Sequence, residues 1–322
     1  MKSLHTWNLI KNSLDRHTPV MLLYVLESSG SSPGRQGFCM AVNAAGDMVG
    51  SIGGGMMEHK FVELAKERLR DASDTQHSPT VRKQIHDKLA DKNQSGMICS
   101  GEQTILLYPV QTADAANVNH IIAALQHHRN GRLLLSPMGI EFDASAAEKD
   151  FEFELQSEAN WWYREKLGYK NQLYIIGGGH CALALSQLMR TMDFYIRVYD
   201  DRAALKTMLE NESAHEKHFI DDYTELHSLI PPGDHHYVVI MTFGYRTDDT
   251  AVRALAGKDF KFIGLLGSQT KINKMFDEYR SEGLDPGWLS SIHTPVGVQI
   301  RSHTPEEIAV SIAAEIIRVK NG

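Results

Sequence analysis

The sequence predicts two α/β domains, the second of which contains a doubly wound parallel sheet of the Rossmann type. The chain has 322 residues. Since a domain commonly holds roughly 150 residues, two hydrophobic cores are expected. From residue 173 onward short β-rich runs alternate with helical patterns, which is typical of a parallel sheet. A glycine-rich turn lies between the first of these strands and its helix, as in dinucleotide-binding folds.

Composition excludes several classes of protein. Hydrophobic residues make up 42% and charged residues 23% of the chain, so neither a disordered nor a fibrous protein is expected. The formal net charge is −7, and no long basic run occurs, so nucleic acid and anionic membranes are not expected partners. No apolar stretch reaches the roughly 18 residues that span a bilayer, and residues 1–12 do not resemble a signal peptide. The expected location is the cytoplasm.

The first half is predicted to be a mixed α and β domain over residues 1–142. Apolar residues at helical spacing alternate there with short β-rich runs and turns. The expected elements are a helix over 4–16, strands over 20–26, 38–42 and 49–52, a helix over 56–69, a strand over 104–110, a helix over 115–128 and a strand over 133–136. Over residues 143–171 acids and aromatics alternate without a helical period, which indicates a strand pair or a linking segment.

The second half, residues 172–322, repeats strand and helix. The expected strands cover 173–176, 195–199, 237–242 and 262–265, and the helices that follow them run to residue 192 or begin at residues 202, 248 and 270. This order predicts the parallel, doubly wound sheet. It also predicts that ligands bind at the carboxyl ends of the strands.

Residues 177–182 form a G-x-G-x-x-A fingerprint directly after a predicted strand. Gly177 permits the tight turn, and Gly179 lets a phosphate approach the backbone N–H donors of the helix start. His180 either fills a variable position or faces the ligand. Asp200 ends the next predicted strand, about 20 residues after the first glycine, where a ribose-binding acid belongs. These features predict a nucleotide or phosphate site.

A second glycine run, Gly53, Gly54 and Gly55, precedes the helix expected over 56–69, so another anion site is possible at that helix start. Glu58 lies in the first turn of this helix. It either complements the helix dipole or accepts hydrogen bonds from the ring N–H groups of a heterocyclic ligand.

Two further loops of the first half carry polar or soft side chains. Ser32 and Arg35 supply a hydroxyl and a guanidinium, which bind phosphate unless this is an ordinary surface loop. Cys99 stands between an apolar run and a glycine turn, where its thiol either reaches a ligand or is structural. In the second half, Gly267 and Ser268 either line the cleft at the strand ends or form a plain strand-to-helix turn.

Together these motifs resemble the XdhC/CoxI family, the accessory proteins of xanthine dehydrogenase and related molybdenum hydroxylases. The resemblance is carried by residues 30–33, 50–55 with Glu58, Cys99 with Gly101, 177–180, 200–202, 264–268, 292–297 and 304–309. Two departures stand out. Ser100 follows Cys99 where many relatives have glycine, and residues 241–248 replace a usual Thr-His-Asp.

The resemblance implies an N-terminal XdhC-type domain, a C-terminal Rossmann-like domain and a chaperone of the molybdenum cofactor. Such a protein binds the pyranopterin (molybdopterin), protects it while its terminal sulfur is installed, and delivers it to an apo-hydroxylase of the xanthine dehydrogenase type. Turnover is not required, so an enzyme is not expected. The resemblance also implies a cysteine desulfurase partner and a homodimer.

A pterin with a phosphate or nucleotide tail presents a polar ring, a dithiolene and an anionic end, and these call for different protein groups. We expect Cys99 to approach the metal or its sulfur and Glu58 to bind the ring. Arg35 and either glycine loop would hold the phosphate. Two alternatives stay open: an NAD(P)-dependent oxidoreductase that uses the Rossmann loop, and a nucleotide-sensing regulator.

Overall fold

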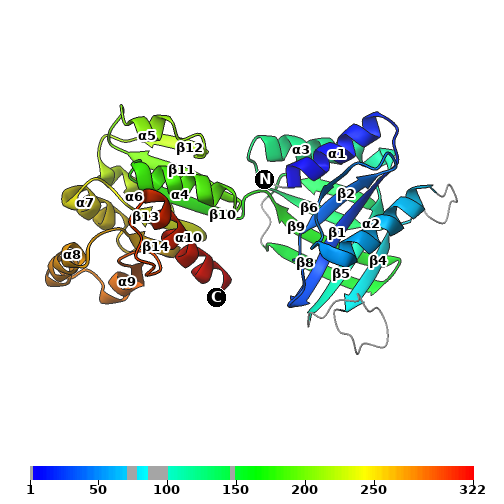
Figure 1. Cartoon of the computed structure of the whole chain (residues 1–322). Helices are drawn as coiled ribbons and strands as arrows, with labels where there is room; N and C mark the ends of the chain where they lie inside the picture. Colours follow the sequence, from blue (N-terminus) through cyan, green and yellow to red (C-terminus); the bar gives the residue numbers. More distant parts are fainter. Residues whose placement is uncertain (1–2, 71–77, 86–100, 146–148) are drawn as a thin grey trace. The chain divides into compact units, whose positions relative to one another are not determined.

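The computed structural model describes residues 3–70, 78–85, 101–145 and 149–322, and it contains two compact units, Met1–Gly168 and Tyr169–Gly322 (Figure 1). The first unit contains α1 (Ser3–Asp15), β1 (Val20–Gly30), β2 (Cys39–Asn43), β3 (Met48–Gly50), α2 (Gly55–Arg70), β4 (Thr80–Ile85), β5 (Gly101–Pro109), α3 (Ala115–Gln126), β6 (Gly131–Ser136), β7 (Gly139–Asp143), β8 (Phe151–Ser157) and β9 (Asn160–Leu167).

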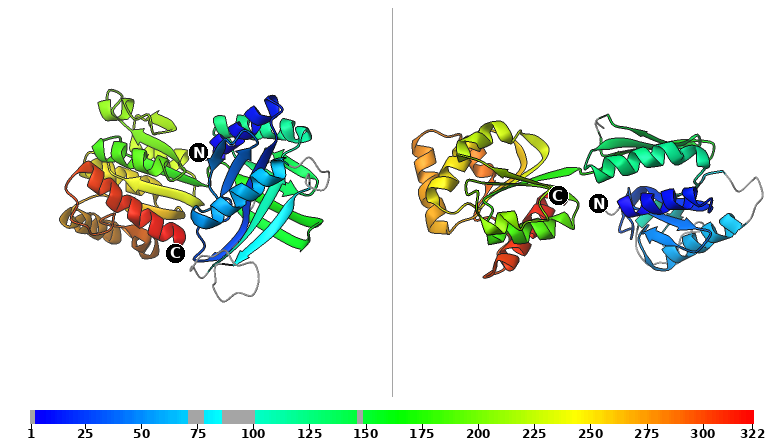
Figure 2. Two further views of the ribbon diagram at one scale, coloured as in Figure 1. Left: turned by 45° about the vertical axis from the view of Figure 1, so that its right-hand side comes forward. Right: turned by 90° about the horizontal axis from the view of Figure 1, so that it is seen from above.

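Two antiparallel sheets build the first unit, with strand orders β3-β2-β1-β5-β4 and β7-β6-β9-β8. The central strand β1 is apolar on both faces because both faces are covered. Helix α2 packs on one face through Met57, Phe61 and Val62. Helices α1 and α3 and the second sheet pack on the other face, where Trp7 and Ile10 are fully buried (Figure 2). The expected mixed α and β architecture is confirmed.

Of the two interpretations that the sequence allowed for residues 143–171, the structure contains the strand pair rather than the linking segment. These residues contain the β8–β9 hairpin, which completes the second sheet, and the first unit extends to Gly168 rather than to residue 142. The reason is a period of two along β9: Trp161, Tyr163 and Leu167 point into the core, whereas the residues between them are partly exposed. This alternation is that of a half-buried strand.

A buried carboxylate connects the two sheets. Glu165 on β9 is 7% exposed, and its Oε2 accepts hydrogen bonds from the hydroxyls of Tyr24 on β1 (2.6 Å) and Tyr163 (2.8 Å). Burial, and then the nearby carboxylate, raise the pKa of both tyrosines well above the usual range. Burial likewise raises the pKa of the neighbouring Cys39 thiol to about 12, so this cysteine is a neutral core residue.

The second unit has the strand order of a Rossmann fold. Its elements are β10 (Asn171–Ile176), α4 (His180–Arg190), β11 (Phe194–Asp200), α5 (Lys206–Leu209), β12 (Glu216–Phe219), α6 (Leu226–Leu229), β13 (Gly233–Ile240), α7 (Tyr245–Leu255), β14 (Phe260–Leu265), α8 (Gln269–Ser281), α9 (Pro286–Ser291), β15 (Ile292–His293) and α10 (Pro305–Asn321). The parallel sheet runs β12-β11-β10-β13-β14-β15, so the order reverses direction between β10 and β13. Ligands of such sheets bind at this switch point.

Helices cover both faces of this sheet. Helices α4 and α10 bury Leu185, Ile312 and Ile316 on one face, and α6, α7, α8 and α9 cover the other (Figure 1). The predicted doubly wound fold is therefore confirmed. Among the residues that the structure describes, no helix is both long and apolar enough to cross a membrane.

The contact between the sheets predicts a measurable loss of stability. Replacing Tyr163 by phenylalanine leaves the buried carboxylate of Glu165 with one donor fewer. We expect the free energy of unfolding of the first unit to fall by about 1–3 kcal/mol, the cost of an unsatisfied buried polar group. Urea denaturation measures it. Tyr195→Phe removes a partly buried hydroxyl in the second unit as a control, and an equal loss in the control would contradict the assignment.

Candidate functional site

The glycine loop of the second unit joins β10 to α4 at the switch point. Gly177 has φ +102°, and a Cβ there would lie 2.4 Å from the carbonyl oxygen of Met241, so the fold itself requires glycine. Gly179 is the N-cap of α4 with φ −70°, and a Cβ there would meet nothing within 4 Å. Since neither backbone nor packing demands glycine at residue 179, its small size leaves space for a ligand beside the helix start.

Asp200 holds this loop from the neighbouring strand β11. Its side chain is fully buried, and it accepts hydrogen bonds from the backbone N–H of Gly178 (2.6 Å), from the backbone N–H of Arg202 (2.9 Å) and from Nε (2.8 Å) and Nη2 (2.7 Å) of that guanidinium. Burial opposes ionisation, but the hydrogen bonds from Arg202 and Gly178 outweigh it and lower the pKa of Asp200. A ribose hydroxyl would have to displace one of these donors.

The loop after β13 stands beside the glycine loop. Asp248 on α7 is 1% exposed and accepts hydrogen bonds from Thr242 N (3.0 Å), from Thr242 Oγ1 (2.5 Å) and from Lys271 Nζ of α8. Thr242 Cα would lie 2.8 Å from a Cβ on Gly177. The ion pair between Asp248 and Lys271 thus fixes the loop after β13, which lies beside the glycine loop at the switch point.

The remaining predicted site residues of the second unit lie at or just before the starts of helices α4 and α8. Ser268 is the N-cap of α8 and accepts from the backbone N–H of Lys271 (3.4 Å), so it serves as a helix cap. Gly267 precedes it without a positive φ. His180 is exposed on the first turn of α4.

Two loops of the first unit, residues 31–38 and 51–54, meet near the end of β1 and the start of β5. Gln103 on β5 is 1% exposed, and its amide donates to the carbonyls of Gly34 (2.9 Å) and Ile52 (3.2 Å). Ser32 is buried, and its hydroxyl donates to the carbonyl of Gly34 (3.0 Å). Arg35 is exposed, and its Nη1 donates to the carbonyl of Gly30 (2.9 Å). Both of these predicted residues therefore support the loop that carries them.

At the second glycine run, a carboxylate of the helix that follows takes the position of an external anion. Glu58 Oε2 accepts from Ser51 Oγ (2.7 Å) and from the backbone N–H groups of Ile52 (2.9 Å) and Gly54 (3.0 Å). Partial burial opposes ionisation, but the hydrogen bonds from Ser51 and these backbone groups lower the pKa of Glu58. The carboxylate fills the place that the sequence assigned to an external phosphate. An anion site on residues 53–55 would require Glu58 to move.

The structure describes only some of the residues considered as thiols or metal ligands. Cys99 lies outside the described residues. Gly101, two residues later, packs against the loop of Ser32, since a Cβ on Gly101 would lie 2.6 Å from Ser32 N. Burial raises the pKa of the Cys181 thiol, so it is not an activated thiolate. No group of three histidine, cysteine or acidic residues within the described part of the chain is arranged to hold a metal ion.

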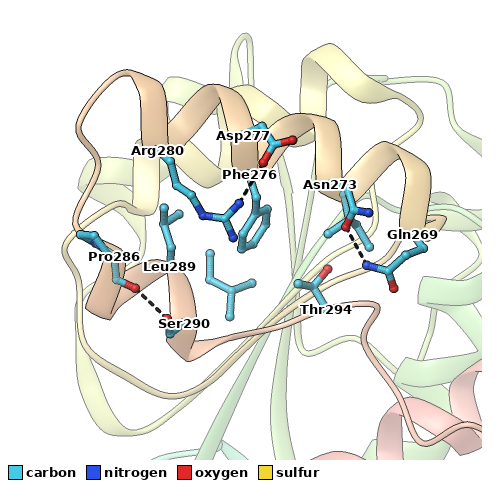
Figure 3. Close-up of a pocket in the computed structure, with 11 residues that line it drawn as sticks. Gln269, Asn273, Phe276, Asp277, Arg280, Pro286, Leu289, Ser290 and Thr294 are labelled. Atoms are coloured by element: carbon cyan, nitrogen blue, oxygen red, sulfur yellow. Dashed lines mark hydrogen bonds and ion pairs between the residues drawn. The ribbon is translucent and has the colours of Figure 1, made fainter.

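A cavity of about 460 Å³ lies between α8, α9 and the end of β15. Its polar side chains are largely paired within its own wall: Gln269 with Asn273 (2.8 Å), Arg280 with Asp277 (3.0 Å) and Ser290 with the carbonyl of Pro286 (2.8 Å) (Figure 3). Of the family motif at 292–297, Ile292 and Thr294 line this cavity. None of the predicted site residues does.

Sequence reasoning missed the residues that hold these loops together. Gln103 was detectable as the polar side chain within a buried strand, which indicates a hydrogen-bonding role. Arg202 and Lys271 could not be recognised as residues that hold the loops, because a basic residue in the sequence does not indicate which acid it contacts. Their partners, Asp200 and Asp248, become evident only in three dimensions.

Family models match both units. The model described as "XdhC and CoxI family" matches residues 13–79, and the model described as "XdhC Rossmann domain" matches residues 173–316. The second match begins within β10 and ends in α10, so it covers the parallel sheet and its glycine loop.

Individual relatives share the same regions. The chain is 24% identical over 317 residues to the uncharacterized protein YqeB of Escherichia coli and 29% identical over 158 residues to a probable xanthine dehydrogenase subunit of Bacillus subtilis. These matches cover 95% and 48% of this chain but only 44% and 45% of the relatives, so the chain spans less than half the length of either. A crystal structure described as a xanthine dehydrogenase from Bacillus halodurans is 20% identical, with a TM-score of 0.71 over 100% of this chain and 96% of that one; it shows the shared fold.

The two glycines of the Rossmann loop should respond differently to a methyl group. We expect Gly177→Ala to lower the free energy of unfolding by about 1–3 kcal/mol, because its φ is positive and its Cβ meets a carbonyl oxygen. Gly179→Ala should stay within about 0.5 kcal/mol of the natural protein. Urea denaturation compares them, and equal losses would show that Gly179 is also required by the fold.

The hydrogen bonds of Glu58 predict a pH-dependent stability. A carboxyl whose pKa is lowered on folding stabilises the protein above its unfolded pKa of about 4.3, and this contribution disappears as the pH falls through the lower folded value. The melting temperature of the natural protein should therefore exceed that of Glu58→Gln at pH 7, and the difference should shrink between about pH 5 and pH 3. Glu67→Gln, on the exposed side of the same helix, controls for net charge. A difference independent of pH would contradict this role.

Proposed function

Because the chain belongs to the XdhC and CoxI family, we propose that it is an accessory protein of a xanthine dehydrogenase-type molybdenum hydroxylase. Its cargo is the molybdenum cofactor, which it binds, protects during sulfuration and delivers to the apo-hydroxylase. A cysteine desulfurase is the proposed source of the sulfur, and a homodimer is the proposed assembly. The chain itself has three cysteines, fewer than the four thiolates that one Cys₄ iron–sulfur cluster needs.

The open helix start at Gly179 carries this proposal. A Cβ on Gly179, the N-cap of α4, would meet no atom within 4 Å, so there is room beside this helix start for the phosphate of the cargo. The geometry favours this loop over residues 53–55, where the N–H of Gly54 is already bonded to Glu58 and the N–H of Gly53 to Ser51 Oγ. Cys99 remains the proposed soft ligand for molybdenum or its sulfur, since thiolates suit such metals. Arg35 and Glu58 each hold their own loop through one atom, Nη1 and Oε2, and would contact the cargo through the other nitrogens of the guanidinium and through Oε1.

The rival function, an NAD(P)-dependent oxidoreductase, uses the same loop. It would rely on Asp200 to bind the ribose, yet that carboxylate is buried and already accepts four hydrogen bonds. This observation favours the carrier over the oxidoreductase.

Retention of the cofactor tests the proposal. Protein purified from a host that makes the pterin should carry it, as measured by molybdenum content and by the fluorescence of the oxidised pterin. We expect Cys99→Ala and Gly179→Asp each to reduce retention at least about tenfold, which corresponds to a loss of about 1.4 kcal/mol or more of binding free energy. Cys181→Ala is the matched control for a cysteine that should not contact the cargo.

Two results would contradict the proposal. Unchanged retention in both Cys99→Ala and Gly179→Asp would remove the assigned binding residues. Oxidation of NADH or NADPH by the purified protein with a small metabolite, together with no pterin, would establish the oxidoreductase instead.

A further inference from the structure

Helix α10, the longest helix of the second unit, has apolar side chains on its outer face. It lies beside α4 on one face of the parallel sheet (Figure 2). Its inner face buries Ile312 and Ile316. On its outer face Val310 is 51% exposed, Ile317 is 37% exposed, and Ala314 between them is exposed too. Because these three residues are four and three positions apart, they form one stripe along the solvent side of the helix.

The other long helices of this unit have no such stripe. On α4, α7 and α8 every exposed residue is polar or charged, as expected for helices that face water. Side chains that do not reach the core add little to folding, so the fold does not require apolar residues on the outer face of α10. Single exposed apolar residues are ordinary, but a row of them at helical spacing indicates a surface that another molecule covers.

The charged residues that flank the stripe are complementary to those of a second, reversed copy of the helix. The first turn of α10 carries Glu306 and Glu307, and its last turn carries Arg318 and Lys320. With about 3.6 residues per turn, Glu306 and Lys320 lie on one side of the stripe, whereas Glu307 and Arg318 lie on the other. Glu306 is about 11 Å before the midpoint of the stripe, and Lys320 is about 10 Å beyond it. Reversing the helix therefore exchanges acid for base on each flank.

We propose that α10 packs antiparallel against α10 of a second copy of the chain, across a two-fold axis that passes near Ala314. Val310 of each copy then contacts Ile317 of the other, and the small side chain of Ala314 lets the helices approach closely. Because the same flanks of both helices meet in an antiparallel pair, Glu306 of each copy faces Lys320 of the other. A parallel pair would place Glu306 beside Glu306. The inference rests on the proposed function only in its assembly, a homodimer.

The length of the helix indicates how strong this contact is. Helix α10 has 17 residues, so it is about 25 Å long. A single pair of such helices falls at the low end of the sizes of protein interfaces, where associations are weak. We therefore expect a reversible dimer with a dissociation constant in the micromolar range.

Sedimentation velocity of the full chain at several concentrations tests the interface. We expect the natural protein to dimerise between about 1 and 100 μM. Val310→Lys and Ile317→Lys should each weaken the dimer at least about tenfold, since the two-fold axis introduces every substitution twice. Leu209→Lys and Leu229→Lys are the matched controls and should stay within about twofold of the natural protein. These leucines of α5 and α6 are 53% and 39% exposed, close to the values of the stripe, and circular dichroism verifies that every variant is folded.

Exchanging the charges tests the antiparallel register. Glu306→Lys and Lys320→Glu should each weaken the dimer at least about threefold, because like charges then face each other across the two copies. The double variant should return to within about twofold of the natural protein. Its net charge is that of the natural protein, so its comparison with the single variants separates the pairing from the overall charge.

Three results would overturn the inference. They are a natural protein that stays monomeric up to about 100 μM, a dimer that both lysine variants of the stripe leave intact, and a double charge variant that associates no better than the single ones. The second result would assign the stripe to a different partner. Pterin retention tests the carrier function separately: a natural protein that dimerises through α10 without retaining pterin contradicts the carrier alone, and a monomer that retains pterin contradicts the interface alone.

Discussion

The second unit depends on the carboxylate of Asp200. A glycine turn exposes backbone N–H groups that need acceptors, and burying one without a partner costs about 1–3 kcal/mol. Asp200 satisfies Gly178 from the neighbouring strand and at the same time fixes Arg202. One side chain thereby joins the ends of β10 and β11 at the edge where ligands of parallel sheets bind. The loop therefore depends on this contact as well as on its own glycines, and its acid is a positioning residue.

In the first unit a carboxylate also accepts hydrogen bonds from the N–H groups of a glycine loop, but there it blocks the helix start instead of leaving it open. The glycine run of this unit also presents N–H groups at a helix start, but the acceptor, Glu58, comes from that helix and occupies the position of an external anion. At α4 the acceptor comes from outside the helix and reaches only Gly178, so the approach to Gly179 stays open. Two glycine loops that look alike in sequence therefore differ in their capacity for an anion. The location of the nearest carboxylate decides which of them leaves room for one.

The sequence predicted the second unit well, because its determinants are local: the strand before Gly177, the glycines and the helix after them lie within a few turns of chain. It predicted the place of Asp200 but not its partners, since a side chain at a strand end can face a ligand or the loop beside it. For residues 143–171 it offered a strand pair but not the sheet that the pair joins, because the pairing of β9 with β6 connects segments about thirty residues apart and the alternation of apolar side chains does not indicate a partner strand. The acceptors of Gln103 were hidden for the same reason, since both lie in loops distant in sequence.

The candidate site can be distinguished from its scaffold by features that the fold does not require. Gly177 is explained by backbone geometry, and Asp248 by the loop and the ammonium group it holds. The space at Gly179 and the exposed ring of Phe243 have no such explanation, and both lie at the carboxyl edge of one sheet. The cavity beside α8 shows the reverse, because its polar side chains are largely paired with one another. Residues that contribute little to stability but gather at a switch point are those that ligand binding has to account for.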